Sequence, residues 1–196
     1  MKHIRNIPIY ADNLFVYKLD IKDDLTLKFT KEKFKSDLDF PLFITEDFNI
    51  LKKYKKLNEE ISKAIDATLK KILLLENINY RIFSSWITKV NPRGFSGLHT
   101  HSNSWLSGVY YPKSDPGFNI KFCHDKTSPF FTPPTSYNIF NSREWIINPE
   151  DNFLILFFSQ LRHKIMPNQS NKDRFSLAFN VLPKGEFGNR DSKIIF

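Results

Sequence analysis

Two different hydrophobic periods run along the chain, and the change between them falls near residue 78. Over residues 46–77, apolar side chains recur every three or four positions with no glycine or proline among them, a spacing that predicts an amphipathic helix. Asn58, within this stretch, is the point at which it would divide into two helices. Beyond residue 78, short runs rich in aromatic and β-branched residues are separated by turn-forming residues, a pattern typical of strands. The predicted strands are 82–90, 106–111, 118–123, 144–147, 153–158 and 174–181.

The flanking segments complete the picture of one mainly β domain. Residues 1–45 hold further β-prone runs, and turn residues at 115–117 and 149–152 predict β-hairpins. The proline-rich stretch 126–143 has the length of a lid or binding loop. Many short strands with turn signals favour a sandwich, a barrel or a jelly roll. We therefore expect a single α+β domain over 1–196, mainly β with flanking helices. Its parts are 1–77 (N-terminal strands and helical support), 78–182 (the β core) and 183–196 (a C-terminal extension).

Composition narrows the class of protein further. Hydrophobic residues make up 41% of the 196 residues and include 20 phenylalanines, enough for one core, which excludes a disordered or fibrous chain. No apolar run reaches the roughly 18–20 residues of a membrane helix, and the first residues do not resemble a signal peptide, so we expect a soluble, cytoplasmic protein. The single cysteine excludes an intrachain disulfide and a multi-cysteine metal cluster. The net charge of +8 is spread along the chain and names no partner.

The histidines provide the first candidate chemistry. His99 and His101 flank one threonine, so in an extended strand both imidazoles would project from the same face and could grip a divalent metal. His163 follows the apolar run 153–158 and is the candidate third ligand, because a jelly roll brings distant strand ends together. The structural alternative is that these histidines are ordinary polar side chains. His3 and His124 have no ligand spacing and are expected at the surface.

An arginine at the start of a late strand provides the second candidate. Arg174, Ser176, Ala178 and Asn180 alternate along the run 174–181 and would share one face. A guanidinium that faces the interior is costly to bury unless a carboxylate pairs with it. By itself it would be read as a solvent-facing arginine or an internal Arg–Asp pair. Beside a metal site, an anion-binding role is the better interpretation.

These residues together resemble a known family. The sequence is similar to the small Fe(II)- and 2-oxoglutarate-dependent (2OG-Fe(II)) oxygenases of bacteria and phages, over roughly residues 80–182. The resemblance is carried by Trp86, Gly94, the run HTHSNSWLSGVYY at 99–111, Gly117 before 120–122, the run LFFSQLRHKIMP at 156–167, and RFSLAFN at 174–180.

The resemblance implies a double-stranded β-helix, the jelly roll of cupin-like proteins. It implies Fe(II) held by His99, His101 and His163, with 2-oxoglutarate as co-substrate and O2 as oxidant. Arg174, Ser176 and Tyr111 would bind the distal carboxylate of 2-oxoglutarate, and Asn103 and Asn180 would contact the metal ligands or the substrate. The expected reaction couples decarboxylation of 2-oxoglutarate to succinate with oxidation of a C–H bond. Trp86 would either wall the pocket or pack in the core.

One departure from the family keeps alternatives open. The superfamily pattern is His-x-Asp/Glu, whereas His101 stands where the acid would be; Asp125 and Asp151 lie near turns and are weak replacements. Three histidines also suit a cupin-like zinc or iron enzyme that needs no 2-oxoglutarate, and a non-catalytic jelly-roll binding module is the other alternative. The primary substrate could be a protein residue, a nucleobase or a metabolite. The sequence does not fix the oligomeric state, for which a homodimer is one option, and a phage protein would work in the host cytoplasm.

Overall fold

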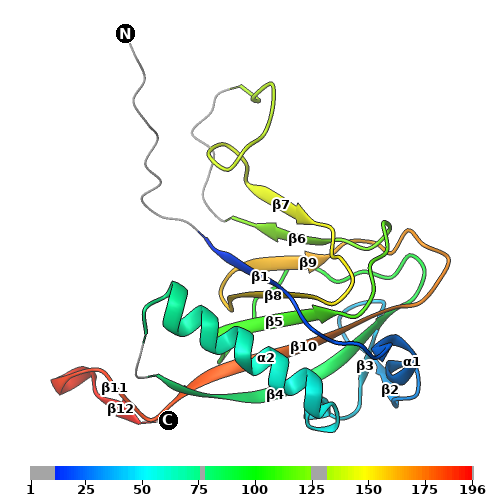
Figure 1. The fold of residues 1–196 in the computed structure, drawn as a ribbon. Helices are drawn as coiled ribbons and strands as arrows, with labels where there is room; N and C mark the ends of the chain where they lie inside the picture. Colours follow the sequence, from blue (N-terminus) through cyan, green and yellow to red (C-terminus); the bar gives the residue numbers. More distant parts are fainter. Residues whose placement is uncertain (1–11, 76–77, 125–131, 196) are drawn as a thin grey trace.

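The computed structural model describes residues 12–75, 78–124 and 132–195, so the expectations for His3 and Asp125 lie outside the described residues (Figure 1). Up to residue 90 the elements are β1 (Leu14–Lys18), α1 (Leu25–Phe29), β2 (Phe34–Ser36), β3 (Phe43–Thr45), η1 (Ile50–Lys53), α2 (Lys55–Ala67), η2 (Thr68–Ile72) and β4 (Asn79–Val90). The later elements are β5 (Leu106–Tyr111), β6 (Ile120–Cys123), β7 (Glu144–Ile147), β8 (Phe153–Phe158), β9 (Arg162–Ile165), β10 (Arg174–Lys184), β11 (Glu186–Phe187), η3 (Arg190–Ser192) and β12 (Ile194–Ile195).

Two antiparallel sheets form the β core. The major sheet has seven strands in the order β1-β8-β5-β10-β4-β3-β2, and the minor sheet has three in the order β7-β6-β9. An apolar cluster with members from both sheets occupies part of the space between them. Its members include Val90, Val109, Tyr111 and Phe157 of the major sheet and Ile120 and Phe122 of the minor sheet. The mainly β fold class predicted from the sequence is confirmed, and the two-sheet arrangement is that of a jelly roll.

The other face of the major sheet is covered by α2, which lies across β5, β10 and β4 (Figure 1). Leu57, Ile61 and Ile65 of α2 are at most 1% exposed and belong to the same buried cluster as strand residues of the major sheet. The predicted amphipathic helix is therefore confirmed in type. It does not divide at Asn58, through which α2 runs unbroken; the break lies at Tyr54, whose backbone (φ −108°, ψ 65°) leaves the helical region between η1 and α2.

The predicted strands are present, but two expectations about their connections were wrong. The turn residues at 115–117 and 149–152 do not close hairpins, because they connect β5 to β6 and β7 to β8, and each pair is split between the two sheets. Turn chemistry specifies that the chain reverses, whereas the partner of each strand depends on the core. In addition, β9 is a separate strand after β8 that was not among the predicted strands, and His163 lies within it.

Close packing across the major sheet makes Gly108 of β5 sensitive to substitution. A Cβ atom at this position would lie 2.2 Å from the ring of Phe179 and 2.7 Å from a methyl group of Leu156. We expect Gly108→Ala to lower the free energy of unfolding by about 1–3 kcal/mol, as overpacked core substitutions do. Urea denaturation measures this loss. Thr100→Ala, an exposed substitution, is the control and is expected to stay within about 0.5 kcal/mol; an equal change in both variants would contradict the prediction.

Candidate active site

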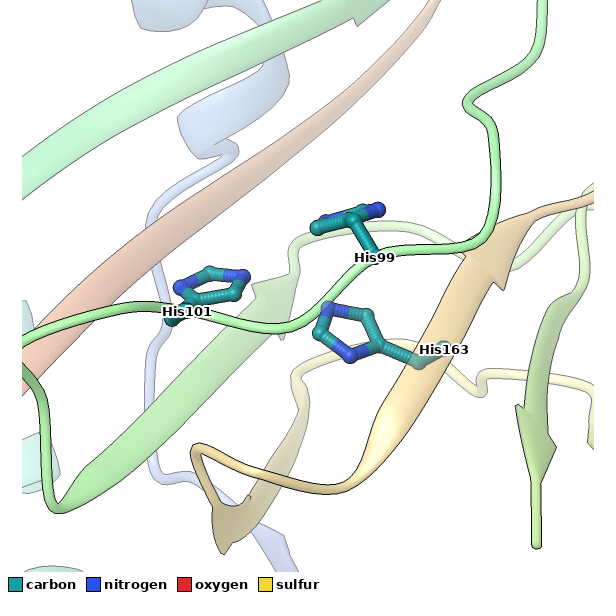
Figure 2. A group of neighbouring side chains, drawn as sticks. All are labelled: His99, His101 and His163. Atoms are coloured by element: carbon teal, nitrogen blue, oxygen red, sulfur yellow. The ribbon is translucent and has the colours of Figure 1, made fainter. Parts of the chain in front are cut away.

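The three candidate ligands converge, and the backbone explains why. The segment that leads into β5 runs antiparallel beside β9: His99 and His163 exchange two backbone hydrogen bonds, each 3.0 Å long, and the His101 N–H donates to the Ser159 carbonyl at 3.0 Å. One ligand nitrogen from each of the three histidines lies within 4.8 Å of the others. Figure 2 shows the rings of His99 and His101 reaching from one segment toward that of His163 on β9. The expected grouping of the i and i+2 side chains is seen, although this segment is not a regular strand.

Hydrogen bonds select which nitrogen each imidazole offers. The Nδ1 atoms of His99 and His163 each lie 2.9 Å from a backbone carbonyl oxygen, of Gly97 and Leu161 respectively. A carbonyl only accepts, so both Nδ1 atoms carry the proton and both Nε2 atoms keep a free lone pair. Nδ1 of His101 lies 2.6 Å from the side-chain oxygen of Asn180. All three rings therefore present Nε2 for ligation, with Nδ1 engaged by a neutral oxygen in each case.

Burial keeps the imidazoles of His101 and His163 uncharged at neutral pH. It lowers the pKa of His163 to about 3, and the neighbouring charge of His99 adds to the effect. Burial also lowers the pKa of His101, although the hydrogen bond to Asn180 opposes the shift. A neutral imidazole has the lone pair that a metal needs, so these two ligands require no deprotonation before binding.

The imidazoles open into a cavity of about 340 Å³ between the two sheets. Tyr111, Ser176 and Asn180, three of the residues selected from the sequence, line it together with the histidines. Trp86 also lines it, and its ring stacks on His101 with 5.8 Å between centroids, so it walls the pocket. Asn103 differs from expectation: it is exposed in a turn with a φ of 54° and is not among the lining residues. The turn at residues 102–103, directly after His101, places Asn103 at the surface.

Arg174 is the buried cation of this region. Its side chain is 6% exposed, its Nε lies 3.7 Å from a carboxylate oxygen of Asp115, and its guanidinium carbon lies 3.7 Å from the centroid of the Phe118 ring. Nη1 and Nη2 are buried and have no hydrogen-bond partner among the described residues. Burial lowers the pKa of Arg174 to about 10 against the opposing charge of Asp115, so it stays a cation. Arg174 does not itself line the cavity, although Ser176, next on the same strand face, does.

These two features fit the groups that the sequence pattern implies. Two unpartnered, buried guanidinium donors match a carboxylate, which would remove the cost of leaving them without hydrogen bonds. Three neutral nitrogen donors match a divalent transition metal. The single Asp115 contact at 3.7 Å engages only Nε, so the internal Arg–Asp pair considered from the sequence leaves the terminal donors unused.

Among the described residues, the group of side chains close enough to share a metal consists of the three histidines, and no carboxylate belongs to it. Asp151 lies on the surface, where its carboxylate accepts from the Ser114 N–H and pairs with Lys113, and the Ser114 contact holds its pKa below the usual range. Asp37 is the acid that lines the cavity, and one of its oxygens accepts from the backbone N–H groups of Asp39 and Phe40. Sequence reasoning missed Asp37 because nothing local relates it to the histidines.

Other contacts of the site were equally beyond local reasoning. Asp115 and Phe118 reach Arg174 through the connection from β5 to β6, and Gly97 and Leu161 act through backbone carbonyls. A carbonyl acceptor leaves no signature in side-chain type. For Asp115, the turn motif was visible but its partner was not.

Comparisons with known proteins relate the chain to one family model and to several solved structures. Residues 84–180 match the model of the family described as "Putative 2OG-Fe(II) oxygenase". A prolyl-4-hydroxylase from Pseudomonas putida is similar in structure with a TM-score of 0.57 and 14% identity, covering 89% of this chain and 95% of that chain. HygX from Streptomyces hygroscopicus, solved with nickel and 2-oxoglutarate bound, has a TM-score of 0.62 and 9% identity, covering 87% and 82%. An oxidoreductase of the 2OG-Fe(II) oxygenase family from Burkholderia pseudomallei gives 0.56 and 12%, covering 80% and 75%. A search of curated proteins found no match.

The structural likenesses define the fold as the double-stranded β-helix of 2-oxoglutarate oxygenases. The family match covers the segment that carries all three histidines, Arg174, Ser176 and Asn180. The family match and the three-histidine group support a 2OG-Fe(II) oxygenase, an enzyme that uses Fe(II), 2-oxoglutarate and O2. None of the helices in the described residues is long and apolar enough to cross a membrane.

Proposed function

We propose that His99, His101 and His163 hold the Fe(II), and that Arg174, Tyr111 and Ser176 bind the distal carboxylate of 2-oxoglutarate. The carrying observation is the convergence of three imidazoles with engaged Nδ1 atoms in one cavity, beside a buried guanidinium with two unpartnered nitrogens. The proposed reaction is hydroxylation of a C–H bond in a primary substrate, with 2-oxoglutarate converted to succinate and CO2.

Each residue has a separate task in this proposal. The three histidines supply nitrogen donors, and burial keeps protons off His101 and His163. Arg174 supplies a fixed positive charge with two free donors for the co-substrate carboxylate. Burial raises the pKa of Tyr111, so its hydroxyl keeps its proton and can donate a hydrogen bond to an anion. Ser176 adds a hydroxyl on the same strand face as Arg174.

The walls of the cavity control what enters. Fe(II) and 2-oxoglutarate, when bound, supply the activation of O2 and the oxidation of the C–H bond. Val109, Ile120 and Phe157 line the cavity with apolar surface, which excludes bulk water from the reacting groups. A volume of about 340 Å³ must hold both the co-substrate and the reacting carbon. It therefore suits a protein side chain, a single nucleobase or a small metabolite as the primary substrate.

An anaerobic titration tests this assignment. Purified protein with Fe(II) and 2-oxoglutarate is expected to show a weak visible charge-transfer band, because the co-substrate chelates a metal held by the histidines. Iron binding without that band would favour a three-histidine enzyme that needs no 2-oxoglutarate. Failure to bind iron would favour a non-catalytic module. Formation of succinate under air would provide a second, independent readout.

A further inference from the structure

A row of polar side chains crosses the centre of the major sheet at the cavity. Asn180 of β10 lies opposite Ser84 of β4 and Ser107 of β5 in the two ladders. The Ser107 hydroxyl donates to the Asn180 side-chain oxygen at 2.9 Å, and the Asn180 amide nitrogen donates to the Ser84 hydroxyl at 3.2 Å. The row is continued by a 2.8 Å contact between the hydroxyls of Ser107 and Ser159. Asn180 is 9% exposed, and Ser107 is fully buried.

The amide oxygen of Asn180 also forms a hydrogen bond with Nδ1 of His101, 2.6 Å away. With the oxygen on that side, Nδ1 must carry the ring proton and Nε2 must keep its lone pair. The reverse tautomer would place a proton on Nε2 and remove His101 from the set of possible ligands. The tautomers of His99 and His163 are fixed without a side chain. Their Nδ1 partners are backbone carbonyls, which cannot flip to present a donor as a side-chain amide can. His101 is therefore the one candidate ligand among the described residues whose tautomer depends on a side chain.

The residue that holds His101 is also uncharged. A carboxylate at this position would push electron density onto the imidazole, whereas an amide fixes its orientation with less effect on its basicity. The register of the strands explains the precision of the contact: Asn180 is held from both sides by neighbouring strands, and the register shift between β10 and β4 follows it immediately. Its side chain has little freedom to leave His101.

We propose that Asn180 is a positioning residue that locks His101 in the Nδ1–H tautomer and thereby completes the metal site. The proposal rests on the proposed function, in which His101 is a ligand. Asn180 acts through His101 and does not itself touch the metal. Loss of the amide oxygen is expected to weaken metal binding by about 10–100-fold, the usual size of such effects.

Two measurements test the role of Asn180. The first is a long-range ¹H–¹⁵N spectrum of the metal-free protein at pH 8, which reports the tautomer of each histidine. We expect His101 to be the Nδ1–H tautomer in the wild type and a mixture in Asn180→Leu. The second is calorimetric titration with Co²⁺, in which Asn180→Leu is expected to bind 10–100-fold more weakly. Asn180→Asp keeps an acceptor and is expected to bind Co²⁺ within about threefold of the wild type or more tightly.

Ser84→Ala is the matched control, because it removes a hydrogen bond from the same row but not the contact with His101. We expect this variant to keep the Nδ1–H tautomer of His101 and to bind Co²⁺ with an affinity within about twofold of the wild type. That change is small compared with the 10–100-fold effects of residues that hydrogen-bond a metal ligand. Should Asn180→Leu fail to fold, Asn180→Ala provides the same test. A pure Nδ1–H tautomer and unchanged Co²⁺ affinity in the folded variant would overturn the proposal. Failure of the wild type to bind Co²⁺ would instead overturn the proposed function, while the tautomer spectra would still decide the role of Asn180.

Discussion

Replacing His163 by alanine is expected to abolish Fe(II) binding and succinate formation together. His163 is 4% exposed, the most buried of the three histidines, and it alone comes from β9. Its removal leaves two imidazoles on one irregular segment, too few to hold a metal against water. The loss should exceed the 10–100-fold effects typical of residues that contact a ligand without binding the metal. Anaerobic Fe(II) titration and a succinate assay measure it.

His124→Ala is the matched control for this prediction. His124 lies 3.2 Å from Asp12 and is not among the residues that line the metal cavity. We expect its removal to leave both Fe(II) binding and succinate formation unchanged. Stoichiometric Fe(II) binding by a folded His163→Ala protein would show that the metal is held elsewhere.

Replacing Arg174 by methionine is expected to weaken 2-oxoglutarate binding while leaving the metal in place. Removing one partner of a buried, hydrogen-bonded charge pair costs about 2–5 kcal/mol, so the affinity should fall by at least about thirtyfold. Arg174→Lys keeps the charge but not the fork of donors and should recover only part of the loss. Calorimetric titration of the metal-loaded protein with 2-oxoglutarate gives the affinity, and a parallel titration with the metal alone confirms that the histidines are intact.

The stability of the Arg174→Met variant distinguishes a role of Arg174 in binding 2-oxoglutarate from a role in the fold. The two unpartnered nitrogens of Arg174 disfavour the ligand-free fold, and Asp115 is partly exposed and can turn to water. We therefore expect Arg174→Met to be at least as stable as the wild type without 2-oxoglutarate. Lys89→Met removes the same charge from a neighbouring pair with Asp173 and should change 2-oxoglutarate affinity by less than twofold. A strongly destabilised Arg174→Met with normal 2-oxoglutarate affinity would assign Arg174 to the fold.

How well each feature could be predicted from the sequence depends on how far apart along the chain the interacting residues lie. Strands such as 106–111 and 153–158 could be predicted because short runs rich in aromatic and branched residues between turns are typical of strands. The grouping of His99 with His101 followed from the alternation of side chains along extended backbone. The alternation did not extend to Asn103, because the turn after His101 ends it and leaves Asn103 exposed. The contact between Asn180 and His101 joins residues 79 positions apart, and it depends on the register of three strands that no local pattern specifies.

The same limit applies to the connections between the sheets. Residues 115–117 have the composition of a hairpin turn, and the Asp115 side chain does accept from the Gly117 N–H. The chain nevertheless passes from the major to the minor sheet there, because β5 is already paired on both sides by β8 and β10. That crossing brings Asp115 and Phe118 to Arg174. Local chemistry defined the turn, and competition between strands for partners defined where it leads.

Because His99 pairs with His163 of β9, metal binding is thermodynamically coupled to the stability of the minor sheet. The segment that carries His99 and His101 lies beside β9. It is attached to β9 and to Ser159 by a few backbone hydrogen bonds and forms no regular ladder. A ligand that requires both sides to be in place adds its binding free energy to their association, about 2.7 kcal/mol at a concentration of 100 times its Kd. A bound metal would thus hold the segment of His99 and His101 against β9 at the edge of the jelly roll. Where iron is limiting, the protein would be less stable as well as inactive.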